Sequence, residues 1–168
     1  MVKKAVLFVT LATIFVALFS MQVSAFSIET IHGEIIKSET LLEKGPILLD
    51  FWSTSCRPCL SKLPHVSRFA TKYPEMSFFA ISTDSPRHKD NVMRQIRSSR
   101  YEFTTGFDGT RNLQRLFNVT AIPRTIIINQ TGQIVYDNTG YNSGDEVKLE
   151  ETIVKILSGE FESSIQGE

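Results

Sequence analysis

The sequence is poor in cysteine and histidine, and it has no excess of charge of either sign. Its 168 residues include two cysteines and three histidines, and 18 basic residues balance 18 acidic ones. No basic stripe is present, which argues against a nucleic-acid partner. There is also no internal repeat or low-complexity tract. A chain of this length, 42% of it hydrophobic, is expected to form one globular domain with a substantial core.

The scarcity of metal-binding side chains limits what the two cysteines can do. Cys56 and Cys59 are separated by two residues, and a structural bridge across so short a loop would constrain almost nothing in the unfolded chain. A zinc site needs four ligands, and the sequence adds only three scattered histidines. Leu60 replaces the histidine that a Cys-x-x-Cys-His haem-attachment motif requires. We therefore interpret the pair as a redox site.

The long apolar run of the chain lies at its N-terminus. Lys3 and Lys4 precede an apolar stretch over residues 5–19, and Val23-Ser24-Ala25 fits a cleavage site after Ala25. The pattern predicts a signal peptide over residues 1–25 and a periplasmic or otherwise extracytoplasmic domain over residues 26–168. An uncleaved membrane anchor is the alternative, although the run is short for a full membrane span. No cysteine follows the run, which excludes a bacterial lipoprotein.

After residue 25, strand and helix patterns alternate along the chain. This order predicts an α/β fold with a central mixed sheet and helices on both faces. Residues 158–168 are polar and are expected to fray. The expected strands are 47–52, 76–83, 101–106, 125–129 and 133–137, after a small β extension in 26–37. The expected helices are 38–44, 57–73, 86–99, one capped by Asp108 or Thr110, and 145–157.

The strand that leads to the cysteines carries one acid. Ile47–Trp52 is an apolar run interrupted only by Asp50, as expected for a central strand that is buried on both faces. Because burying an acid costs free energy, Asp50 is a candidate functional group as well as a possible structural acid. Between the cysteines, Pro58 suits the first turn of a helix, where a missing N–H costs nothing.

These motifs together resemble the thioredoxin fold. Asp50-Phe51-Trp52 before Cys56-Arg57-Pro58-Cys59 has the spacing of that family, and Pro64 stands where its helix kinks. Ile122-Pro123 resembles the family's cis-proline, and Gly140 resembles the glycine beside its substrate groove. An additional β-α element within residues 76–118 and the signal peptide make the chain similar to exported TlpA/ResA-type thiol-disulfide oxidoreductases.

Three positions depart from those patterns. TlpA/ResA-type proteins often carry Asn where this chain has Asp50, and Glu where it has Lys62. Ser55 replaces the tryptophan that precedes the first cysteine in thioredoxin. Two hypotheses for Lys62 stay open at this point. It either offsets the charge of Asp50 or of a Cys59 thiolate, or it is an ordinary surface lysine.

The resemblance implies a role for each site residue. Cys56 at a helix N-terminus, next to Arg57, would be stabilised as a thiolate and would attack a substrate disulfide. Cys59 would then displace the substrate, with Asp50 accepting its proton. The backbone of Ile122, before a cis Pro123, would pair with the substrate. Trp52 would pack near the motif, although a plain core aromatic is an equal alternative.

The implied function is that of an extracytoplasmic thiol-disulfide oxidoreductase that acts on protein disulfides. The resemblance favours a monomeric reductant that needs no cofactor beyond the Cys56–Cys59 pair. It would be kept reduced by a membrane thiol-transfer protein and would serve cytochrome c maturation or similar clients. A disulfide-forming oxidase is the nearest alternative. A copper(I) chaperone is a third, because soft thiolates favour that ion.

Overall fold

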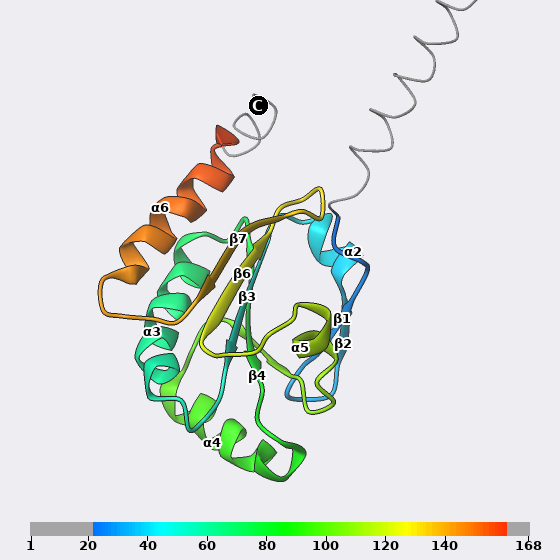
Figure 1. Cartoon of the computed structure of the whole chain (residues 1–168), viewed down its shortest axis with the longest axis vertical. Helices are drawn as coiled ribbons and strands as arrows, with labels where there is room; N and C mark the ends of the chain where they lie inside the picture. Colours follow the sequence, from blue (N-terminus) through cyan, green and yellow to red (C-terminus); the bar gives the residue numbers. More distant parts are fainter. Residues whose placement is uncertain (1–21, 161–168) are drawn as a thin grey trace, which may run out of the picture.

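A five-stranded mixed sheet organises the computed structural model, which describes residues 22–160 (Figure 1). Its strands are β3 (Ile47–Trp52), β4 (Ser77–Ser82), β5 (Thr104–Phe107), β6 (Arg124–Ile128) and β7 (Ile134–Thr139). Their order across the sheet is β5-β4-β3-β6-β7. The central strand β3 runs parallel to β4 and antiparallel to β6, while β7 is antiparallel to β6.

Helices cover both faces of this sheet, as the sequence predicts (Figure 1). One face carries α3 (Arg57–Lys72), α4 (Lys89–Ser99) and α6 (Asp145–Leu157). The other face carries α2 (Ser38–Leu42), α5 (Asn112–Leu116) and a hairpin of β1 (Ser27–Glu29) with β2 (Ile35–Lys37). The predicted α/β fold, with its small N-terminal β extension and additional β-α element, is therefore confirmed.

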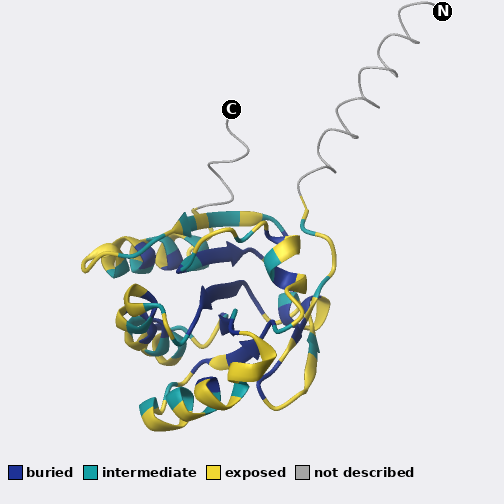
Figure 2. Cartoon of the chain, turned by 60° about the horizontal axis from the view of Figure 1, so that its bottom comes forward, coloured by how far each residue is buried: buried dark blue, intermediate teal, exposed yellow. Residues whose placement is uncertain are grey.

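The alternation of side chains along β3 divides the core into two layers. All six residues of β3 are buried. Leu48 and Trp52 belong to the cluster under α3, α4 and α6, whereas Leu49 and Phe51 belong to the cluster on the opposite face. In Figure 2 the buried strands accordingly lie between two covering layers. Because strand residues alternate with period two, Asp50 points to the same side as Leu48 and Trp52, toward α3.

Some boundaries differ from the sequence prediction by a few residues. The strand expected at 101–106 is Thr104–Phe107. Tyr101 and Phe103 precede it and stack on each other, with ring centroids 4.9 Å apart. The helix expected at 86–99 begins as the 3₁₀ turn η1 (Pro86–His88), a frequent form at helix N-termini. The N-cap residue of α5 is Arg111, so the expected cap at Asp108 or Thr110 is wrong by position, but the Asp108 carboxylate still accepts the backbone N–H groups of Leu113 and Gln114 in the first turn.

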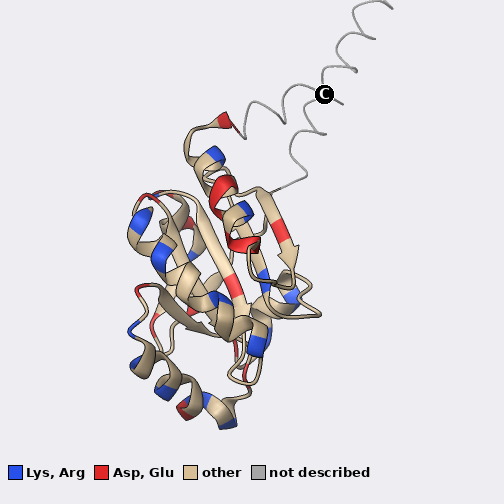
Figure 3. Cartoon of the chain, turned by 90° about the vertical axis from the view of Figure 1, so that its left-hand side faces the viewer, with Lys and Arg blue, Asp and Glu red and all other residues tan. Residues whose placement is uncertain are grey.

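The predicted signal peptide falls largely outside the described residues, as does most of the predicted C-terminal tail. Within residues 22–160 there is no helix long and apolar enough to cross a membrane. Basic and acidic side chains are interspersed along α4 and α6, as Figure 3 shows, whereas α3 carries basic residues and no acidic one. The surface of α4 and of α6 therefore shows both signs of charge.

A tight backbone approach before β3 gives a stability prediction. Gly45 has a φ of 155°, and a Cβ at this position would collide with the backbone carbonyl oxygen of Glu75. Gly33 also has a positive φ, of 89°, but has nothing within 4 Å of a Cβ. We expect Gly45→Ala to lower the free energy of unfolding by about 2–4 kcal/mol, from strain plus overpacking, and Gly33→Ala by only about 1 kcal/mol. Urea denaturation would measure both, and equal losses would contradict this account.

Candidate active site

The two cysteines form a disulfide at the beginning of α3. Cys56 is the N-cap residue, and its Sγ accepts the backbone N–H of Cys59 at 3.3 Å. Pro58 occupies the first turn, where helices lack intrahelical partners for their N–H groups. Cys56 is partly exposed, whereas Cys59 has no exposed surface. The Cys56 sulfur is therefore the one that another protein can reach.

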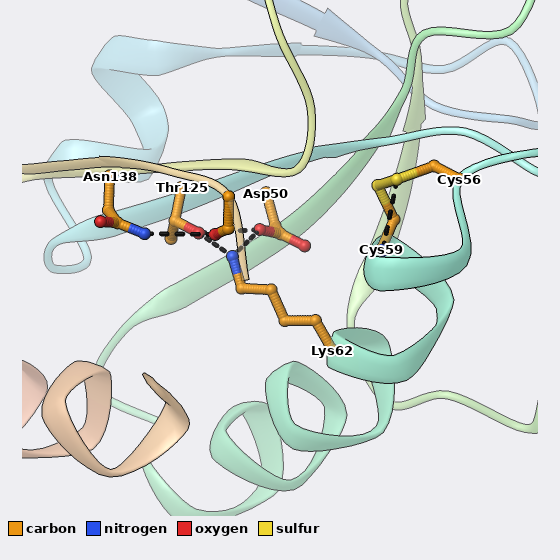
Figure 4. Close-up of polar contacts among 7 residues, drawn as sticks. Asp50, Cys56, Cys59, Lys62, Thr125 and Asn138 are labelled. Carbon is orange, nitrogen blue, oxygen red and sulfur yellow. Dashed lines mark hydrogen bonds and ion pairs between the residues drawn. A yellow bond between two sulfur atoms is a disulfide. The ribbon is translucent and has the colours of Figure 1, made fainter. Parts of the chain in front are cut away.

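Behind the disulfide lies a buried ion pair. Lys62 Nζ is 2.5 Å from Asp50 Oδ1, and the exposed fractions of the two residues are 3% and 0%. The Thr125 hydroxyl donates to the same oxygen at 2.9 Å and also contacts Lys62 Nζ. The other carboxylate oxygen, Oδ2, is buried without a hydrogen-bond partner. In Figure 4 this oxygen points toward Cys59.

The fold brings these three side chains together from distant parts of the sequence. Asp50 and Thr125 are direct partners in the antiparallel pairing of β3 with β6. Lys62 lies three residues after Cys59 on α3, so its side chain comes from the same helix face as the cysteine. A buried charge without a partner is very costly, and the pairing offsets that cost. The surface-lysine hypothesis for Lys62 is therefore wrong.

A second segment faces the end of β3. The Ile122–Pro123 peptide bond is cis, and the next residue, Arg124, pairs with Phe51 of β3. The backbone N–H of Gly140 donates to the Pro123 carbonyl at 2.7 Å. Ile122 is partly exposed and packs against the same core cluster as Cys56. The cis-proline segment and Gly140 thus lie at the edge of the sheet from which the cysteine loop departs.

Arg124 fixes the start of β6. Its guanidinium binds both carboxylate oxygens of Asp137, at 2.8 and 2.6 Å, and the carbonyl of Asn118 at 2.6 Å. The hydrogen bond to Asp137 raises the pKa of Arg124. The arginine therefore ties the segment before the cis-proline to β7.

Trp52 and Arg57, on either side of the cysteine pair, differ in exposure: Trp52 is buried in the core, and Arg57 lies at the surface. Trp52 is fully buried in the cluster that contains Cys59, and its Nε1 has no hydrogen-bond partner. It is thus a core aromatic that also packs beside the motif. Arg57 is exposed and lines a hollow of about 430 Å³, together with Pro58, Ser61, His65, Tyr141 and Ser143.

The sequence did not single out several of these residues. Tyr141 forms a wall of the hollow, and its hydroxyl donates to Glu146 at 2.8 Å. Thr125 was expected only as a strand residue, and Asp84, which binds the loop before Cys56, was not selected. The only signal that the sequence offered for these two residues was position, because Asp84 lies two residues after β4, a neighbour of β3, and Thr125 lies two residues after Pro123. Over residues 22–160, no group of three or more His, Cys, Asp or Glu side chains could hold a metal ion.

A Cys-x-x-Cys disulfide at a helix N-terminus, next to a cis-proline on a five-stranded mixed sheet, defines a thiol-disulfide oxidoreductase. A model of the AhpC/TSA family matches residues 20–137, and the chain belongs to that family.

Named relatives agree with this class. The thiol-disulfide oxidoreductase ResA of Halalkalibacterium halodurans is 30% identical over 68% of this chain and 65% of its own length. Among solved structures, a putative thiol:disulfide interchange protein DsbE from Chlorobium tepidum superimposes with a TM-score of 0.73 at 24% identity. That match covers 82% of this chain and 96% of the other. A secreted disulfide oxidoreductase of Mycobacterium tuberculosis gives a TM-score of 0.66 at 19% identity, over 77% of this chain and 94% of the other. These two structures support the fold.

The buried ion pair predicts strongly coupled stability effects. Lys62→Met should lower the free energy of unfolding by about 3–5 kcal/mol, because Asp50 would remain buried and unpaired. In the double variant Asp50→Leu/Lys62→Met, most of this loss should be recovered, since neither charge is left alone. Chemical denaturation of the single and double variants would measure the coupling. Additive losses would show that the two charges do not stabilise each other.

The Tyr141–Glu146 pair predicts a pH dependence of stability. Hydrogen bonds from its own backbone N–H, the Tyr141 hydroxyl and the Gly144 N–H lower the pKa of Glu146 from 4.5 to about 2. A lowered carboxyl pKa stabilises the fold above pH 4.5, and this contribution is lost as the pH falls to about 2.

Wild-type stability should therefore fall more steeply between these pH values than that of Tyr141→Phe, which lacks one donor. Unfolding followed at a series of pH values would show the difference. Tyr101→Phe is the control, because Tyr101 stacks on Phe103 instead. A wild-type slope equal to that of Tyr141→Phe would contradict the assignment.

Proposed function

We propose that this chain is an exported reductase of protein disulfides in which Cys56 is the attacking thiol. The observation that carries the proposal is the asymmetry of the pair: Cys56 is partly exposed at the N-terminus of α3, and Cys59 is fully buried behind it. A helix N-terminus stabilises a thiolate at Cys56, and the adjacent Arg57 adds a positive charge.

The reaction proceeds in two exchanges. In the reduced protein, the Cys56 thiolate attacks one sulfur of the substrate disulfide. A Cys56–substrate disulfide forms, and the other substrate sulfur leaves as a thiolate. Cys59 then loses its proton and attacks the Cys56 sulfur. The Cys56–Cys59 disulfide forms, the second substrate sulfur leaves, and the substrate has gained two electrons.

Asp50 is the proposed acceptor of the Cys59 proton. Its Oδ2 is buried, free of hydrogen bonds and directed toward Cys59, as a general base requires. Lys62 and Thr125 bind only Oδ1, so they orient the carboxylate without occupying the oxygen that would receive the proton. Lys62 also balances the buried charge. We assign Asp50 as the base and Lys62 as a positioning residue.

The proposed substrate groove runs beside Cys56. A substrate in extended conformation would pair with the backbone of Ile122, and the bond from Gly140 to Pro123 would hold that segment in place. The hollow lined by Arg57, Pro58 and Tyr141 would take residues next to the substrate cysteine. Trp52 supports this surface from beneath.

The cell location and electron flow are further parts of the proposal. The N-terminal sequence pattern supports export with cleavage after Ala25, and one structural relative is described as secreted. Similarity to the thiol-disulfide oxidoreductase ResA supports exchange with protein thiols. That the chain is a monomeric reductant, itself re-reduced by a membrane thiol-transfer protein, is the part of the proposal that follows from the sequence resemblance to exported TlpA/ResA-type proteins.

Trapping of the mixed disulfide would test this function. Cys59→Ser should accumulate a covalent complex with a disulfide-bonded protein such as oxidised ribonuclease, because the second exchange is blocked. Cys56→Ser, the matched control, should trap almost none, since Cys59 is buried. Non-reducing gel electrophoresis would report both. Equal trapping by the two variants would contradict the assignment of Cys56, and no trapping by either would contradict action on protein disulfides.

A further inference from the structure

Asp84 is a buried carboxylate near the cysteine loop that has no part in the exchange reaction above. It lies two residues after β4 and is 8% exposed. Its Oδ2 accepts the backbone N–H of Thr54 at 2.9 Å and the Ser82 hydroxyl at 3.0 Å, and its Oδ1 accepts the Thr54 hydroxyl at 2.8 Å. Two of these three hydrogen bonds hold Thr54, which precedes Cys56 by two residues.

Thr83, the residue before Asp84, forms further hydrogen bonds to the chain that leads to the cysteines. Thr83 donates both its backbone N–H and its hydroxyl to the carbonyl of Trp52, at 2.8 and 3.0 Å. The backbone N–H of Cys56 in turn donates to the Ser53 carbonyl at 3.2 Å. The segment after β4 therefore fixes the course of the chain from the end of β3 to the disulfide.

The fixed position of this loop affects how easily the Cys56–Cys59 disulfide forms. Cys59 is held by α3, so the separation of the two sulfurs in the reduced protein depends on how firmly the preceding loop holds Cys56. Holding two reacting groups in position raises their effective concentration and favours bond formation. Hydrogen bonds to a carboxylate are stronger than those between neutral groups. Asp84 accepts two such bonds from a single residue of this loop, Thr54.

We infer that Asp84 is a positioning residue that stabilises the Cys56–Cys59 disulfide against reduction by holding Thr54. The inference rests on the proposed redox role of the Cys56–Cys59 pair. It adds that Asp84, which takes no part in the exchange reaction, shifts the equilibrium between the dithiol and the disulfide. Loss of the Asp84–Thr54 contacts leaves Cys56 less well placed, so the disulfide is reduced more easily.

Equilibration with dithiothreitol would test this inference. Reduction adds two electrons and two protons to the Cys56–Cys59 disulfide, and dithiothreitol supplies both as it becomes its cyclic disulfide. For Asp84→Ala we expect the equilibrium constant for disulfide formation to fall about tenfold, which makes the potential about 30 mV less negative. Thr54→Val, which keeps the N–H but loses the hydroxyl, should give a smaller fall. Thr54→Ser should retain the wild-type constant.

Asp108 provides a matched control. It is 4% exposed, and its carboxylate also accepts two backbone N–H groups, those of Leu113 and Gln114 in α5. Asp108→Ala should lower stability without changing the redox constant.

Three results would overturn the inference. They are a wild-type constant in Asp84→Ala, an equal shift in Asp108→Ala, or a shift in Asp84→Ala with none in Thr54→Val, which would indicate a charge effect instead of positioning. If Asp84→Ala does not fold, the comparison of Thr54→Val with Thr54→Ser decides. A protein that equilibrates with dithiothreitol but traps no protein substrate would contradict the proposed function and leave this test valid.

Discussion

The buried contact between Asp50 and Lys62 is the constraint on which the site depends. A carboxylate at the centre of a strand that is buried on both faces needs a partner, and Lys62 supplies it from the helix that carries the cysteines. The same contact therefore links the sheet to α3 and sets the orientation of the carboxylate beneath Cys59 (Figure 4). One carboxylate oxygen is held by two side chains, and the other is buried without a hydrogen-bond partner.

Sheet pairing places the remaining parts around this contact. The antiparallel register of β3 with β6 puts Thr125 opposite Asp50 and brings the cis-proline segment to the end of β3. The parallel neighbour β4 ends beside the cysteine loop, where Thr83 and Asp84 bind Trp52 and Thr54. Both strands that flank β3 thus contribute to the disulfide region, β6 through the cis-proline segment and β4 through its contacts with the cysteine loop.

Much of this arrangement could be predicted from the sequence because it rests on local patterns. The apolar run with a single acid predicted a central strand, and Pro58 between the cysteines predicted the helix start. The contacts across the sheet could not be predicted in this way. Thr125 looks like an ordinary β-branched strand residue, and Asp84 like a polar loop residue, until strand register gives each its partner. Lys62 fitted either a surface or a buried role, since a lysine is usually exposed and only its contact with Asp50 decides.

The departures from ResA-like sequences are explained as a pair. Asp50 and Lys62 stand where the resemblance leads one to expect Asn and Glu, so the acid lies on the strand and the opposite charge on the helix. Each change alone would leave a buried group without its partner, whereas the two together give a neutral contact.

The reduction potential of the Cys56–Cys59 pair tests the central claim most directly. The purified protein would be equilibrated against dithiothreitol or glutathione buffers, and the fraction of disulfide would be measured after acid quenching and thiol alkylation. A reductant of protein disulfides predicts a value near −270 mV, as in thioredoxin, whereas a value near −120 mV would make the protein an oxidase and contradict the account.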